Sequence, residues 1–78
     1  MTRLMVMKKT SPAYSEHDEL ESKFSINRWD LFVVTGITAV DVINAQDDPW
    51  VMSEILHPKH GRCWVISTVL SRNAEEVA

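Results

Sequence analysis

The sequence has few of the residues that mark specialised classes of protein. Cys63 is the single cysteine, so no internal disulfide is possible and a disulfide-stapled secreted scaffold is excluded. The two glycines, Gly36 and Gly61, cannot form a glycine-rich phosphate loop. The longest apolar stretch, 31–40, is about half the length needed to cross a bilayer. We therefore expect a cytoplasmic protein with no cofactor and no membrane contact.

Basic residues are also scarce. The chain has eight Lys and Arg residues and eleven Asp and Glu residues, which gives a formal net charge of −3. Affinity for nucleic-acid backbones comes from clustered cations that neutralise phosphates. We therefore expect no direct contact with nucleic acid.

The length and composition indicate one small globular domain. With 45% hydrophobic residues, a chain of 78 residues can bury a core, but only a small and marginally stable one. We expect a single domain over residues 1–78, with 1–3 and 71–78 frayed.

The first half of the chain favours a strand, a helix and a further strand. The apolar run Leu4–Met7 is typical of a short strand. Ser15 and Asp18 have capping-box spacing, which predicts a helix over 15–25. The β-branched and aromatic run 31–35 predicts a second strand, which stops at Gly36.

The second half predicts a strand, a helix and a strand. The β-branched content of 37–43 favours a strand, with a helix as the alternative, and Gly36 would then form a tight turn or bulge. The pair Asp48-Pro49 is typical of a helix start, and Pro58 ends the predicted helix. Residues 63–70 predict the last strand. This order is that of a ferredoxin-like βαββαβ fold, an α+β domain with a four-stranded antiparallel sheet and two helices on one face.

Alternation along the predicted strands leaves one sheet face open and unusually apolar. Such a face is typical of burial against another molecule, which predicts a homodimer or a larger protein partner. The alternative is that the chain's own C-terminal tail or the loop 11–14 covers this face. The residues assigned to this face are Met5, Met7, Leu31, Val33, Val65 and Val69.

An acidic edge is the second candidate docking surface. Tryptophan is enriched at binding hot spots, and one of the three tryptophans lies among acidic residues. These observations predict a partner-binding set made of Asp47, Asp48, Trp50, Glu54 and Trp29. Capping of a helix is the other explanation for Asp47 and Asp48.

The turn that carries His57, His60 and Cys63 holds the only compact set of metal-capable side chains in the sequence. Zinc prefers four nitrogen or sulfur ligands, and a fourth is not evident here. We favour two turn histidines and a structural cysteine. The same residues show no sign of the third group and oxyanion donors that nucleophilic catalysis needs.

These features favour a non-catalytic protein-interaction domain, an inhibitor or adaptor that docks on a larger and possibly nucleic-acid-binding protein. In size and acidity the chain is similar to small inhibitors made by phages and plasmids, such as anti-CRISPR proteins. The alternative is a dimeric regulatory domain that senses a small ligand or zinc at the turn with His57, His60 and Cys63.

Overall fold

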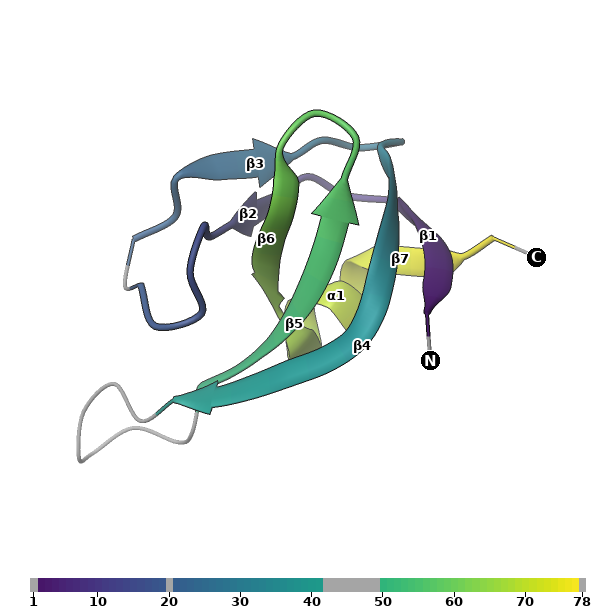
Figure 1. The fold of residues 1–78 in the computed structure, drawn as a ribbon. Coiled ribbons are helices and arrows are strands. Elements are labelled where there is room, and N and C mark those ends of the chain that lie inside the picture. Colours follow the sequence, from purple (N-terminus) through teal and green to yellow (C-terminus); the bar gives the residue numbers. More distant parts are fainter. Residues whose placement is uncertain (1, 20, 42–49, 78) are drawn as a thin grey trace.

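The computed structural model describes residues 2–19, 21–41 and 50–77, and most of them belong to antiparallel β-strands. Five strands form one sheet in the order β6-β5-β4-β1-β7, and β2 pairs with β3 in a second, two-stranded sheet (Figure 1). The elements in chain order are β1 (Arg3–Met7), β2 (Ser11–Ala13), β3 (Phe24–Ile26), β4 (Leu31–Asp41), β5 (Trp50–His57), β6 (Gly61–Ile66), α1 (Ser67–Asn73) and β7 (Ala74–Glu76).

The ferredoxin-like prediction is wrong, because the described chain contains seven strands and one short helix. The pairing is antiparallel, as expected. Neither of the two predicted helices is present among the described residues. The one helix among the described residues, α1, lies behind β4 and β5 (Figure 1). Its first residues, 67–70, were predicted to be the end of the last strand.

The described residues of the predicted helix 15–25 form turns and then β3. Two side-chain contacts between residues four apart form here without a helix, since Ser15 donates a hydrogen bond to Glu19 at 2.6 Å and Lys23 lies 3.5 Å from Glu19. A helix of about eleven residues is marginal without an amphipathic face to bury. Ile26 is fully buried when this segment is extended, so packing decides against the helix.

The predicted helix after Pro49 is replaced by strand β5. The pair Asp48-Pro49 itself lies outside the described residues. Met52, Ile55 and Leu56 suit one face of a helix, yet β5 pairs with β4 on one side and with β6 on the other. Two ladders of backbone hydrogen bonds and burial of Ile55 outweigh the local helix signal.

Strand β4 runs through Gly36, where two separate strands were expected. The register with β5 shifts between Val34 and Thr38, and Gly36 has a φ of 91°, so the glycine marks a bulge within one strand. Toward the C-terminus, β6 stops at Ile66, and residues 67–70 of the predicted last strand begin α1 instead. Residues 71–76, which were expected to fray, complete α1 and form β7. Strand β7 is held because it pairs with β1.

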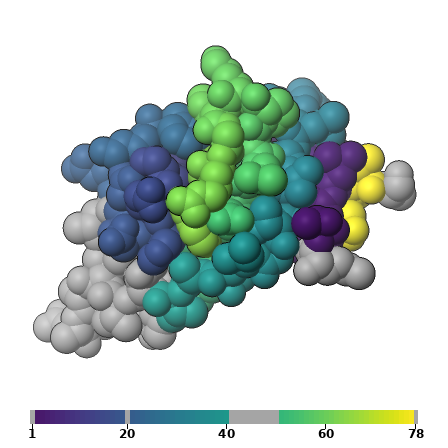
Figure 2. Space-filling model, in the orientation of Figure 1, coloured from purple at the N-terminus to yellow at the C-terminus, as the bar shows by residue number. Residues whose placement is uncertain are grey.

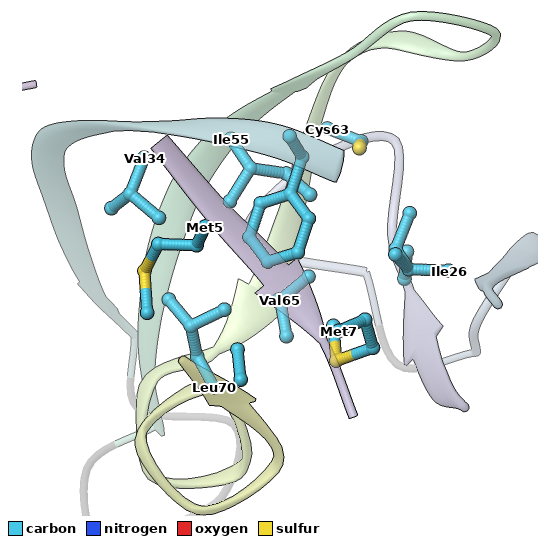
Figure 3. Packing of buried hydrophobic residues seen from close by; sticks show 11 residues of the cluster. Met5, Met7, Ile26, Val34, Ile55, Cys63, Val65 and Leu70 are labelled. Carbon is cyan, nitrogen blue, oxygen red and sulfur yellow. The ribbon is translucent and has the colours of Figure 1, made fainter. Parts of the chain in front are cut away.

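The core lies between the inner face of the five-stranded sheet, α1 and the β2-β3 pair (Figure 3). Alternate residues of β1, β4, β5 and β6 point into it, and Leu70 of α1 and Ile26 of β3 meet them from the other side. Its largest fully buried apolar members are Phe32, Met7, Ile26, Ile55, Val65 and Cys63. The side chains that alternate with these lie on the opposite surface, which we call the outer face.

Candidate functional site

The turn between β3 and β4 holds Trp29 in an unusual backbone conformation. Trp29 has a φ of 75°, in the left-handed region that a bulky side chain rarely adopts. Hydrogen bonds fix this geometry: the Trp29 N–H donates to the carbonyl of Met7 at 2.6 Å, and the Asp30 N–H donates to that of Asn27 at 3.0 Å. The turn is therefore pinned to the end of β1.

The Trp29 side chain is displayed rather than packed. Its exposed fraction is 57%, the highest among the described aromatic residues. Two cations lie against its ring, with Lys8 Nζ at 4.8 Å and Arg28 Cζ at 4.7 Å from the centroid. Lys8 is also 3.6 Å from Glu75 of β7. The result is a large aromatic surface with a positively charged border.

A buried histidine joins this turn to the turn between β5 and β6. His57 Nε2 lies 2.9 Å from Asp30 Oδ2, and His57 Nδ1 accepts hydrogen bonds from the N–H groups of Lys59 and His60 at 3.1 and 3.3 Å. Because Nδ1 accepts, Nε2 carries the hydrogen and donates to Asp30. The His57 bond, followed by one from the Asn27 N–H, holds the pKa of Asp30 below its usual value.

A hollow of about 320 Å³ lies between these two turns. His60 forms part of its wall and stacks on Phe24 and His57, with ring centroids 4.2 and 4.8 Å apart. The turn between β5 and β6 projects beyond the rest of the molecule beside this hollow (Figure 2). The lining residues are Asn27, Trp29, Asp30, Leu31, His57, Pro58, Lys59 and His60.

The outer face carries a patch of three exposed leucines and the half-buried Val33 directly beside this hollow. Leu4 of β1 lies opposite Val33 of β4, and Val33 lies opposite Leu56 of β5, so the three share one face. Leu31 adds to them on β4, two residues before Val33. We call Leu4, Leu31, Val33 and Leu56 the leucine patch.

The leucine patch is open to solvent and continuous with the Trp29 hollow. The exposed fractions of Leu4, Leu31 and Leu56 are 45%, 49% and 45%. The patch lines a second hollow of about 260 Å³, and Leu31, His57 and Pro58 belong to both hollows. Trp29, the two hollows and the patch thus form one surface.

The predicted open sheet face is only partly correct. Met5, Met7 and Val65 are buried in the core, and Val69 is half-buried on α1. Leu31 and Val33 lie on the outer face as expected, although Leu4 replaces the β1 residues that were assigned to it. Strand β1 is apolar at four successive positions, 4–7, so alternation alone cannot say which pair points inward.

The predicted acidic edge is divided by the structure. Glu54 is buried on β5, where it accepts a hydrogen bond from Thr35 at 2.9 Å and lies 3.5 Å from Arg62. Asp47, Asp48 and the Trp50 side chain lie outside the described residues. Trp29 is exposed, and Lys8 and Arg28 lie against its ring in place of the acidic residues of the predicted set. Its use in binding stays a prediction.

The predicted metal candidates do not converge. Both ring nitrogens of His57 are engaged, and Cys63 is buried in the core. Within residues 2–19, 21–41 and 50–77, no three His, Cys, Asp or Glu side chains are grouped so as to hold a metal ion. The His57 and Asp30 pair was missed by sequence reasoning, because its members are 27 residues apart and no motif links them.

The Cys63 thiol should be inert in the native protein. Burial raises its pKa to about 11 from 9.0, and its side chain is inaccessible. Because the thiolate is the reactive form, we expect a disulfide reagent at pH 8 to label Cys63 at least about 100-fold more slowly in native buffer than in denaturant. Equal rates in the two conditions would contradict the placement of Cys63 in the core.

None of the described residues belongs to a helix with the length and apolar character that a membrane crossing requires. The sequence matches no protein-family model, and neither curated proteins nor solved structures give a match.

Proposed function

We propose that this protein is a non-catalytic protein-interaction domain that docks on a larger protein through the leucine patch and Trp29. The observation that carries the proposal is the leucine patch itself, in which three strands of the sheet present aliphatic side chains at neighbouring positions. Exposed apolar residues are ordinary singly, whereas a contiguous group beside a displayed tryptophan is typical of a docking surface.

A partner of another kind fits this surface better than a second copy of the chain. The exposed area of the leucine patch is on the order of a few hundred Å², below the roughly 800 Å² per partner that a stable dimer buries. Its neighbour, the Trp29 turn, is bordered by cations. A patch of this size suits a short segment of a larger protein, and a homodimer is an outcome of the test.

The surroundings of His57 and Cys63 support a role without catalysis. His57 has both ring nitrogens in hydrogen bonds within the fold, so neither is free to move a substrate proton. The Cys63 thiol is buried with a raised pKa. The lone cysteine in reduced, buried form also supports our proposal of a reducing compartment such as the cytoplasm.

Capture experiments with paired variants test this function. We expect immobilised protein to retain a specific partner from the native source, and the double variant Leu31→Ser and Leu56→Ser to retain at least about 10-fold less. The matched control is Val40→Ser with Val51→Ser, two exposed residues that face each other on the distal part of β4 and β5.

Two results would contradict the proposal. Equal retention by the two double variants would remove the leucine patch as the docking surface. Sedimentation of the wild-type protein as a dimer that Leu31→Ser and Leu56→Ser convert to a monomer would assign the patch to a second copy.

A further inference from the structure

We propose that the partner segment is acidic as well as apolar, and that its carboxylates lie over the Trp29 turn while its apolar side chains enter the leucine patch. This inference rests on the proposed function and names the chemistry of the partner. It differs from the charge expected from the sequence, in which an acidic edge would meet a basic cleft.

Cations gather at the Trp29 end of the surface in a protein whose formal net charge is −3. Arg28 and Lys8 lie against the Trp29 ring, and Lys59 lines the same hollow. Within the described part of the chain, neither Arg28 nor Lys59 pairs with a carboxylate. Both can therefore pair with carboxylates of a partner, which would speed association and fix its register.

One carboxylate lies in the hollow itself, and hydrogen bonds within the fold already engage it. Asp30 lines the hollow, but its Oδ2 accepts hydrogen bonds from His57 and from the N–H of Asn27. The Lys8 charge is shared with Glu75 at 3.6 Å, between two exposed side chains whose contact water and salt weaken. The end of the surface that holds Arg28, Trp29 and Lys59 thus keeps a net positive border.

The strained display of Trp29 points to recognition. A non-glycine residue in the left-handed region is strained and persists where the surrounding structure holds it, which is frequent at ligand clamps. Here the strain is held by hydrogen bonds to β1 and by the Asp30 contact with His57. The exposed ring buries little surface in the folded monomer. We therefore expect its stabilising contribution on binding, when a partner covers the ring and strengthens its contacts with the cations.

Aliphatic neighbours favour a peptide over a nucleic acid. Single-stranded nucleic acids bind grooves that combine a continuous positive track with several stacking aromatics. From Trp29 the surface continues instead over Leu31, Pro58 and Leu56, which fit apolar side chains. An extended segment with acidic residues at one end and apolar residues at the other would meet both parts of this surface.

Labelled peptides provide the test, with fluorescence anisotropy as the readout. The probe is a 12-residue peptide with an aspartate-rich half followed by a half of leucine and serine, and its controls are the matched peptide with lysine in place of aspartate and a 12-nucleotide oligothymidylate. We expect the acidic peptide to bind at least about 30-fold more tightly than either control at low salt. Equal or tighter binding of the lysine peptide or the oligonucleotide would overturn the inference.

Three variants locate the binding. Trp29→Asn keeps a residue that tolerates the left-handed region, and it should weaken acidic-peptide binding at least about 30-fold with the free energy of unfolding unchanged or raised. Arg28→Gln with Lys59→Gln should weaken binding about 5-fold or more, and 0.5 M salt should abolish that difference. Arg3→Gln, in a separate hollow beside Leu70 and Ala74, is the control for a cation outside this surface and should change binding less than about 2-fold.

The inference and the proposed function fail separately. If the peptides show no preference for acid while Leu31→Ser and Leu56→Ser still lose the captured partner, the acidic segment is wrong and the docking surface stands. If the double variant keeps the partner, the proposed function is wrong.

Discussion

Replacing Phe32 with alanine should lower the free energy of unfolding by about 3–5 kcal/mol. Phe32 is the largest fully buried side chain, and it extends from β4 into the core beside residues of β1, β5 and α1. Its removal leaves a cavity that the surrounding strands can fill only partly. Since a domain of this length has a total stability of about 4–12 kcal/mol, the variant should be largely destabilised. Urea unfolding followed by circular dichroism measures the change.

Leu31→Ala is the matched control, because Leu31 is the adjacent apolar residue of β4 and points to the outer face. Its exposed fraction of 49% predicts a loss below about 1 kcal/mol. A larger loss from Leu31→Ala than from Phe32→Ala would mean that β4 presents its other face to the core, which would exchange the core and the leucine patch.

His57→Ala should lower the free energy of unfolding by about 2–4 kcal/mol. The change removes a buried ring and leaves the N–H groups of Lys59 and His60 without their acceptor. It also removes one of the two hydrogen bonds to the Asp30 carboxylate. Lys59→Ala, a change of an exposed side chain in the same turn, should cost below about 0.5 kcal/mol. Chemical denaturation at pH 7 compares the two variants. Similar losses of unfolding free energy would contradict the claim that the His57 hydrogen bonds hold the two turns together.

The same variant should raise the pKa of Asp30 toward its ordinary value of 3.8, because the largest cause of its depression is the hydrogen bond from His57. A depressed carboxyl pKa favours folding above pH 3.8, and this contribution is lost as pH falls through the native pKa of Asp30. Titration of the Asp30 carboxyl carbon by NMR, in wild type and His57→Ala, measures the shift directly.

The strands that rest on long β-branched and aromatic runs could be predicted from the sequence. The runs at 4–7 and 31–35 lie in strands β1 and β4, and the first four residues of the run at 63–70 lie in β6. In these segments the local preference and the tertiary pairing favour the same extended conformation, so pattern alone was sufficient.

The two predicted helices rested on local signals that packing outweighs. Ser15 forms its hydrogen bond to Glu19 in a turn, without a helix, and β5 is fixed by ladders to β4 and β6 that no local pattern reveals. Conversely, Thr68 and Val69 are β-branched and favour a strand, yet they belong to α1, whose Leu70 covers the core. Contacts distant in sequence decide all three segments.

The candidate site was predictable only in its single residues. The outer-face positions of Leu31 and Val33 followed from alternation. Trp29 entered the binding set because tryptophan is enriched at hot spots, and no pattern in the sequence indicated that its ring is exposed. These residues form one surface only because contacts with Met7 and His57 hold the Trp29 turn in place. The contact of Met7 with Trp29 joins residues 22 positions apart, and that of Asp30 with His57 joins residues 27 positions apart. No motif in the sequence relates these positions.

Amide hydrogen exchange on the domain, alone and bound to the partner that the wild-type protein captures, tests the docking surface most directly. We predict slower exchange on binding at 29–33 and 56–60, the segments that carry Trp29, the Leu31 and Leu56 positions and the turn after β5, with α1 unchanged. Protection confined to α1 and β7, with 29–33 and 56–60 unchanged, would contradict the proposal that the outer face and the Trp29 turn bind the partner.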